Sequence, residues 1–319
     1  MKKALWWILG ILLSPLVLFV VLTALLYLPP VQNWAVDKVA EIVSEKTGMQ
    51  ISVGHVNLAF PLDLAIDDFK MIHEGDTIAD VGHMVADVEL WPLLKKRVVI
   101  NELEVTNTRL NTNGFVEAAL VKGRFNRLAL TSKGIDLDKQ TVEVNGAQLE
   151  DAHLDIHLRD SVPEDTTTTP TLWKIYADSL TISRSDLTLR LADDSTNIYT
   201  RMGDLKVREV VADLGKPVYS VGSIDWNDGA LRYNDIDMPQ LSLHTGPLRM
   251  ENDSIKAPHL QLKTADSDLI VGLDMPLSLT DSLNPGNMQL TMDAQLARND
   301  LMPFLSSLPR PMQIGRAHV

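Results

Sequence analysis

The chain has 319 residues, of which 45% are apolar and 22% charged, and a formal net charge of −13 at pH 7. This acidic balance argues against nucleic-acid binding, because the protein would repel the phosphate groups. The absence of cysteine excludes disulfides, thiolate chemistry and cysteine-ligated metal sites. Aromatic residues make up only 5% of the chain, so platforms that stack bases or sugars are not expected.

An uncharged apolar run covers residues 4–28, directly after Lys2 and Lys3. A helix of this length would be about 37 Å long, enough to cross a hydrocarbon core of about 30 Å. A cleaved secretory signal is the alternative, but its apolar region is usually about 7–15 residues long and ends in small residues. This run ends in Tyr27 and Leu28. We therefore predict that residues 1–28 are a cytoplasmic tip and a retained transmembrane anchor, and that the remaining chain is exported.

Residues 29–48 predict a short amphipathic helix. Apolar residues recur there at helical spacing, with charges of both signs on the other side, and Gly48 suits the position after a helix end. The helix lies either on the bilayer surface or against the end of a sheet. The mixed charge favours the second arrangement.

From Gln50 onward the hydrophobic period changes from 3.6 to 2, which is typical of strands. Ile51 and Val53 alternate, and the alternation resumes at Val56 after a one-residue shift at Gly54–His55. Many short runs of this kind follow, separated by pairs of turn-forming residues: Asn113–Gly114, Asn145–Gly146, Asp193–Asp194, Asp228–Gly229 and Asn252–Asp253. Because no helical pattern is interleaved, we predict hairpin connections and an antiparallel sheet.

One low-complexity segment interrupts the strand pattern, PEDTTTTP at residues 163–170. The pattern resumes at Leu172, so we predict a flexible loop over residues 161–171 inside a single β domain that covers residues 49–313. Residues 314–319 continue no pattern and resemble a translated sequencing adapter. This predicts that the natural chain extends beyond about Gln313.

Alternating strands have one apolar face, and that face must be covered. Because helices are nearly absent after residue 48, the sheet must close on itself or curl. We predict a mainly β fold in which an elongated, curled antiparallel sheet forms a β-groove. About fifteen strands, spaced by roughly 4.8 Å, would give a length of about 70 Å. The apolar lining of such a groove suits the acyl chains of membrane lipids.

Two segments resemble the amino-terminal region of TamB proteins of the AsmA-like superfamily: TGMQISVGHVNLAFPLDLAIDDFKM and GDTIADVGHMVADVELWPLLKKRVVINELEVTNTRLNT. Together with the anchor, the resemblance covers about residues 1–112. It implies an inner-membrane protein with a periplasmic β-groove and roles in phospholipid transport to the outer membrane and in outer-membrane protein assembly. The family's carboxy-terminal domain, which would meet a TamA-like outer-membrane partner, is not recognisable in this sequence.

The working residues of such a groove are expected to be inward apolar side chains near its entrance: Val56, Leu58, Phe60, Leu62, Leu64 and Ile66. The basic run Lys95, Lys96 and Arg97 either contacts lipid headgroups or forms a solvated turn. The alternative function is an assembly scaffold that offers sheet edges to outer-membrane strands.

Motifs of catalysis and metal binding are not recognisable in the chain. His153 and His157 are expected to share a solvated strand face, opposite Leu154 and Ile156. The segment DWNDG, at residues 225–229, lacks the distal glutamate of a calcium loop and is expected to form a hairpin turn. No nucleotide or phosphate-binding fingerprint occurs. We therefore expect neither an enzyme nor a cofactor.

Overall fold

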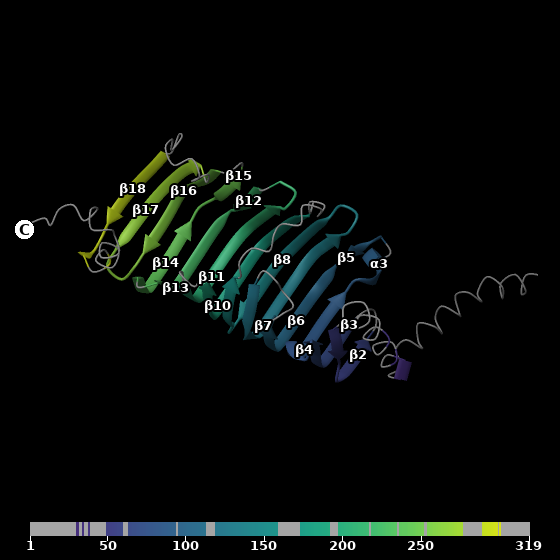
Figure 1. Ribbon diagram of the computed structural model, residues 1–319. Coiled ribbons are helices and arrows are strands. Elements are labelled where there is room, and N and C mark those ends of the chain that lie inside the picture. The colour runs from purple at the N-terminus through teal and green to yellow at the C-terminus, as the bar shows by residue number, and fades with distance from the viewer. Residues whose placement is uncertain are drawn as a thin grey trace, which may run out of the picture.

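The computed structural model describes residues 49–59, 63–93, 95–112, 119–158, 173–191, 197–216, 218–234, 236–251, 254–276, 289–298 and 300, with residues 30, 31, 34 and 38. This part is mainly β and forms one 18-stranded sheet (Figure 1). Within it no helix is long and apolar enough to span a bilayer. The predicted anchor at residues 1–28, most of the predicted helix at 29–48, the loop at 161–171 and the segment 314–319 lie outside the described residues.

The strands follow one another across the sheet in chain order, and a short helix, α3 (Leu90–Leu93), joins β4 to β5. The strands are β1 (Met49–Ser52), β2 (His55–Ala59), β3 (Asp63–His73), β4 (Asp76–Val88), β5 (Arg97–Val98), β6 (Ile100–Asn111), β7 (Ala119–Asp136), β8 (Thr141–Glu150), β9 (His153–Leu158), β10 (Lys174–Arg190), β11 (Asn197–Asp213), β12 (Val218–Val221), β13 (Ser223–Tyr233), β14 (Ile236–Thr245), β15 (Leu248–Glu251), β16 (Ser254–Lys263), β17 (Asp268–Pro276) and β18 (Gln289–Gln295).

Five pairs of consecutive strands are collinear segments of one longer strand: β1 with β2, β5 with β6, β8 with β9, β12 with β13, and β14 with β15. The eighteen strands therefore occupy thirteen positions across the sheet. At a spacing of about 4.8 Å these positions extend roughly 58 Å. This is shorter than the length expected from the sequence, because collinear strands add no width to the sheet.

The prediction of a wholly antiparallel sheet is wrong at one position. β10 pairs in parallel with β8 and β9, so that Lys174 lies opposite Thr141 and Asp186 opposite His153. Parallel neighbours require a crossover of a dozen or more residues. More than a dozen residues separate Leu158 from Lys174, and this connection contains the predicted loop. The chain therefore returns to the edge at which β8 began, instead of turning back in a hairpin.

The long strands bend at corners. At each corner, two successive side chains on the inward face are three residues apart along the strand instead of two. In β10 the inward residues Ala177 and Leu180 are three apart, and so are Ile182 and Ser185. At such skips six residues take a left-handed backbone, with φ between 48° and 54°: Asp68, Asn107, Asp151, Arg184, Glu209 and Asp228. A residue of this kind bends a strand as a β-bulge does.

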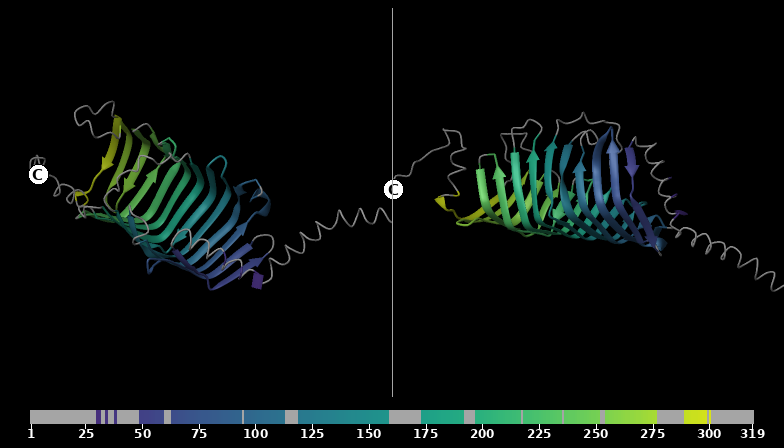
Figure 2. Two further views of the ribbon diagram at one scale, coloured as in Figure 1. Left: turned by 45° about the vertical axis from the view of Figure 1, so that its right-hand side comes forward. Right: turned by 90° about the horizontal axis from the view of Figure 1, so that it is seen from below.

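The corners of neighbouring strands are aligned across the sheet. The pairing of β10 with β11 skips twice, at Asp178 opposite Glu209 and at Arg184 opposite Gly203. The two skips are separated by six residues, or about 20 Å of strand. Two parallel lines of corners therefore divide the sheet into a floor and two walls, and Figure 2 shows the resulting curl.

Glycines occupy positions that a neighbouring corner crowds. A Cβ atom added to Gly203 would lie 2.6 Å from the carbonyl oxygen of Asp228, and one added to Gly222 would lie 2.9 Å from the Cβ of Glu209. No side chain is tolerated at such distances without a backbone shift. The glycines thus allow the corner of one strand to approach the next strand closely.

The apolar face is the concave one. At the corners its side chains are small and buried, with exposed fractions of 1% for Ala152, 2% for Ser185 and 5% for Ala177. On the convex, polar face the side chains at the corners are exposed instead, with fractions of 59% for Arg184 and 76% for Asp228. Side chains converge inside a bend and spread outside it, so the sheet is a trough with an apolar interior.

Two predicted hairpin turns are wrong. Asn145–Gly146 lies within β8, and the DWNDG segment lies within β13. Asn145 lies at a corner opposite Asp178, where the pairing of β8 with β10 also skips, and Asp228 is the left-handed residue of a corner. Asn, Asp and Gly tolerate positive φ equally well in hairpins and in bulges, which explains the confusion.

Candidate functional site

Two rows of side chains run along the floor of the trough, each with one residue per strand position from β2 to β17. Consecutive members of a row are cross-strand partners. The first row consists of Val56, Ile66, Met84, Val105, Leu128, Leu149, Ile182, Leu205, Trp226, Leu243, Leu262 and Leu269. The second row consists of Leu58, Leu64, Ala86, Leu103, Leu130, Ala147, Leu180, Val207, Ile224, Thr245, Leu260 and Val271.

Neither row contains a charged residue, and Thr245 is the one polar member in the two rows. Its side chain is only 7% exposed, and its Oγ1 accepts a hydrogen bond of 3.1 Å from the backbone N–H of Ile224. The hydroxyl is therefore bonded locally and does not interrupt the apolar surface. The largest member, Trp226, donates its indole N–H to the carbonyl oxygen of Arg201 at 3.2 Å.

The floor rows are not packed like a protein core. Apart from Val56 and Thr245, every member is half-buried. Throughout the described ranges, the main contacts between strands are those of neighbours in the sheet, so no second layer lies on the floor. A contiguous apolar surface left open in this way marks an interaction site.

Four of the six predicted groove residues belong to the floor rows. Val56 and Ile66 are partners in the first row, and Leu58 and Leu64 are partners in the second. They lie at the N-terminal end of the trough. Phe60 and Leu62 lie outside the described residues. Contact of these side chains with lipid remains a prediction.

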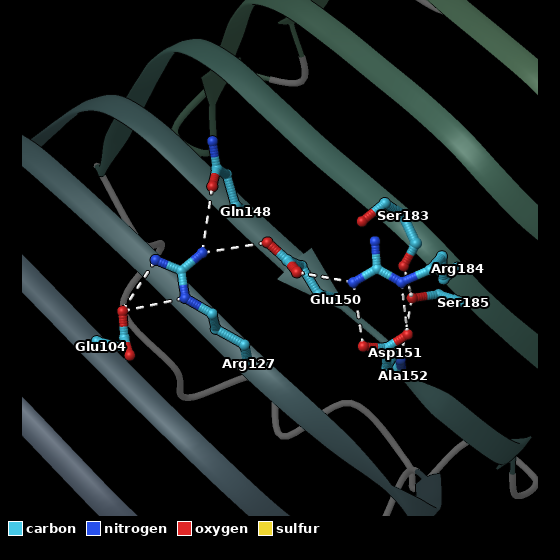
Figure 3. Close-up of polar contacts among 9 residues, drawn as sticks. All are labelled: Glu104, Arg127, Gln148, Glu150, Asp151, Ala152, Ser183, Arg184 and Ser185. Atoms are coloured by element: carbon cyan, nitrogen blue, oxygen red, sulfur yellow. Dashed lines mark hydrogen bonds and ion pairs between the residues drawn. The ribbon is translucent and has the colours of Figure 1, made fainter.

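The convex face carries a ladder of ion pairs instead, and part of it is drawn in Figure 3. The Arg127 guanidinium lies 2.9 Å from Glu104 and 3.1 Å from Glu150. Arg184 continues the ladder across the parallel junction, 2.8 Å from both Glu150 and Asp151. The hydrogen bond with Glu104 raises the pKa of Arg127, and the hydrogen bond from Arg184 lowers the pKa of Asp151. Because these groups are partly exposed, each pair stabilises the fold only slightly.

Ser185 closes the inner side of the corner at the parallel junction (Figure 3). Its Oγ accepts a hydrogen bond of 3.0 Å from the backbone N–H of Ala152 and donates one of 2.8 Å to the carbonyl oxygen of Ser183. The serine therefore satisfies backbone groups where the bend interrupts the regular pairing.

His153 and His157 lie on the convex side of β9, opposite Leu154 and Ile156, as the alternation predicts. The Nδ1 of His153 contacts the carboxylate of Asp186 on β10. Across the described ranges, no three histidine or acidic side chains gather in a way that could hold a metal ion. The geometry therefore places these histidines among the cross-strand pairs of the outer face.

The predicted basic run lies in the turn after α3, at one rim of the trough. The ammonium of Lys96 is 3.0 Å from Asp138, and Arg97 donates a hydrogen bond of 2.8 Å to the carbonyl oxygen of Lys133. Arg97 is thus engaged by β7. Lys95 is exposed, and no ion pair is found for it in the described part of the chain. Of the three basic residues, Lys95 and Lys96 are therefore the ones whose ammonium groups lie in solvent at this rim.

Sequence reasoning missed the corners, although they leave a signal. Strand β10 has apolar or small inward residues in steps of two, interrupted by two steps of three. The shift at Gly54–His55 is the same signal at another corner, where the N–H of Gly54 bonds to the carbonyl oxygens of Asp67 and Asp68.

Comparison with family models and with curated proteins finds no match to this chain.

Proposed function

We propose that the protein binds the acyl chains of membrane phospholipids on the concave face of its sheet and moves or shelters them between the inner and outer membranes. The two uninterrupted apolar floor rows are the observation that carries this proposal. It also draws on the apolar run at residues 4–28, which would tether one end of the trough to a membrane, and on the resemblance to TamB proteins. The working parts are apolar side chains, without a catalytic group or a cofactor.

The dimensions and chemistry of the trough suit this ligand. Each methylene group removed from water contributes about 0.8 kcal/mol, so a bound acyl chain would be held by many small and equivalent contacts. No charge in the floor rows would fix a headgroup at one place. A chain lying along the rows can therefore shift from one strand to the next without losing a strong, specific contact, while its headgroup stays at the open mouth.

A photocrosslinking amino acid in place of Ile182 tests the proposal, with Thr181 as the matched position. The two residues are adjacent in β10, but Ile182 belongs to a floor row and Thr181 lies on the convex face, between Gln148 and Lys206. In cells labelled with radioactive phosphate, we expect a lipid adduct at Ile182 and none at Thr181. Equal labelling at both positions, or adducts with protein alone at Ile182, would contradict the proposal.

We propose strand addition at the edge of the sheet as a second candidate function. The observation that favours it is β18, which pairs only with β17 within the described residues and leaves Leu290 and Met292 56% and 65% exposed. An open strand edge can accept a further strand by main-chain hydrogen bonds. Crosslinks from Leu290 to outer-membrane barrel precursors, without lipid adducts at Ile182, would favour this function over lipid transport.

A further inference from the structure

The two rims of the trough differ in the side chains at their turns. At one rim, which we call the basic rim, the described turn residues are 90–93, 95–96, 137–140 and 214–216, where β4, β7 and β11 end. At the opposite rim, which we call the polar rim, the described turn residues are 74–75, 234 and 264–267. In Figure 1, α3, β5 and β12 lie along the same long edge.

Each turn of the basic rim combines an exposed large apolar side chain with lysine. Trp91, Leu137 and Leu214 are 78%, 51% and 42% exposed. The lysines of these three turns are Lys95, Lys96, Lys139 and Lys216, with Asp138 as the one acidic residue in them. This local excess of positive charge contrasts with the net charge of −13 of the whole chain.

The turns of the polar rim have the opposite character. Their residues are Glu74, Gly75, Asn234, Thr264, Ala265, Asp266 and Ser267. Among these described turn residues there is no lysine and no large apolar side chain. The nearest exposed aromatic side chain, Tyr233, belongs to the end of β13 rather than to a turn.

Backbone hydrogen bonds join the basic rim into one continuous edge. The N–H of Leu137 donates to the carbonyl oxygen of Lys96 at 3.2 Å, which links the first turn to the second. The N–H of Lys174 donates to Gln140 at 2.9 Å, and the N–H of Leu214 donates to Trp173 at 2.9 Å. The start of β10 therefore connects the second turn to the third, so the exposed apolar groups are held along a common line.

We propose that the basic rim docks on the surface of a bilayer that contains anionic phospholipid. Tryptophan and leucine enter the boundary between headgroups and acyl chains, while lysine reaches back to the phosphates. Near an anionic surface each lysine adds to the attraction. The pair of Lys96 with Asp138 is exposed on both sides and can exchange for lipid phosphate, and the ammonium of Lys139 is 78% exposed beside Asp136. This docking does not depend on lipid being bound inside the trough.

The absence of cysteine allows a direct test with the full chain in vesicles of phosphatidylcholine and phosphatidylglycerol. Single-cysteine variants Leu137→Cys and Leu214→Cys carry a fluorophore on the basic rim. Ala265→Cys and Asp266→Cys, which are both exposed, carry it on the polar rim as matched controls. Brominated phosphatidylcholine is the quencher. We expect at least twofold stronger quenching on the basic rim, and we expect this difference to shrink at high salt because the attraction is screened.

Charge reversal tests whether Lys95 and Lys216 are responsible for docking on the bilayer. The double variant Lys95→Glu/Lys216→Glu should reduce quenching on the basic rim to the level of the controls, whereas Lys206→Glu on the convex face should leave it unchanged. Equal quenching on the two rims, or quenching that persists in pure phosphatidylcholine, would overturn the proposal. So would protection of the basic rim that requires a second protein. Lipid adducts at Ile182 without quenching on the rim would remove only the docking proposal.

Discussion

The two faces of the sheet are built from the same strands, yet one carries apolar rows and the other carries polar and charged pairs. On the concave face, neighbours such as Leu149, Ile182 and Leu205 continue one apolar row from strand to strand. On the convex face of the same strands, the residues that follow are charged or polar and form ion pairs such as Arg184 with Asp151. The convex contacts are local and specific, whereas the concave row is uniform.

This difference shows how one layer of strands can be stable and still leave an apolar surface open. Backbone pairing, corners and convex ion pairs fix the shape of the trough without a second layer. The concave face then does not have to be covered by the protein itself. If this account is correct, changes on the concave face affect ligand binding, and changes at the corners or on the convex face affect stability.

The largest effect is expected from a charge placed in a floor row. Leu180→Glu puts a carboxylate on an apolar surface, and burying a charge beside an acyl chain is costly. We expect the lipid adduct of a photocrosslinker at Ile182 to fall by about tenfold or more, which corresponds to about 1.4 kcal/mol or more. Thr181→Glu, one residue away on the convex face, is the control and should leave the adduct nearly unchanged. Equal loss in both variants would mean that the faces do not differ in function.

A methyl group at a crowded corner should reduce stability most strongly. Gly203→Ala places a Cβ 2.6 Å from the carbonyl oxygen of Asp228, so the corner must open. Overpacking of this kind typically costs about 1–3 kcal/mol. Gly146→Ala is the matched control, because its nearest contact would be an ordinary 3.8 Å. The comparison is made by urea denaturation of the detergent-solubilised chain, and a similar free energy of unfolding for both variants would show that the corners are not tightly packed.

Loss of the serine hydroxyl at the parallel junction should have a smaller effect. Ser185→Ala leaves the buried N–H of Ala152 without its acceptor, which costs about 1–2 kcal/mol. Ser183→Ala is the control, because the contact of Ser183 in this corner uses its carbonyl oxygen and not its hydroxyl. The difference is measured as a shift of the urea midpoint. An unchanged midpoint for Ser185→Ala would indicate that the corner does not need this bond.

The smallest expected effect is the pH dependence of the convex ladder. Hydrogen bonds from Arg184 and Arg208 lower the pKa of Asp151 and Asp225 in the folded protein. A lowered carboxyl pKa adds stability above the unfolded value of about 3.9, and that stability is lost as the pH falls through the folded value. We therefore expect the free energy of unfolding to decline below about pH 4.

Replacement of one arginine isolates its contribution to the loss of stability at low pH. Arg184→Gln should make the decline shallower, because Asp151 then titrates more nearly as in the unfolded chain. Lys206→Gln, which removes a longer contact of 3.8 Å to Asp204, serves as the control. If the free energy of unfolding declines equally below pH 4 in the wild-type chain and in Arg184→Gln, the ladder does not couple pH to stability.

The one-faced alternation was sufficient to predict a mainly β, curled sheet and the place of Val56, Leu58, Leu64 and Ile66 on its apolar face. The sequence showed one corner, at Gly54–His55. Asn145 and Asp228 suggested hairpin turns instead, because Asn and Asp favour both, whereas Arg184 and Glu209 carry no turn signal. The parallel pairing of β10 depends on where a long connection returns, which no local pattern encodes. The basic rim was equally inaccessible, since Leu137 and Leu214 share one edge of the sheet with the lysines after α3 only through the order of the strands.

The most direct test of the central claim is a scan of lipid crosslinking along β10. The account predicts lipid adducts at Ile175, Leu180, Ile182, Leu187 and Leu189. Labelling should thus follow the inward residues across the corners at Asp178 and Arg184, and the intervening convex positions should remain unlabelled. Adducts with other parts of the chain at the inward positions, or lipid labelling without regard to face, would contradict an open apolar trough.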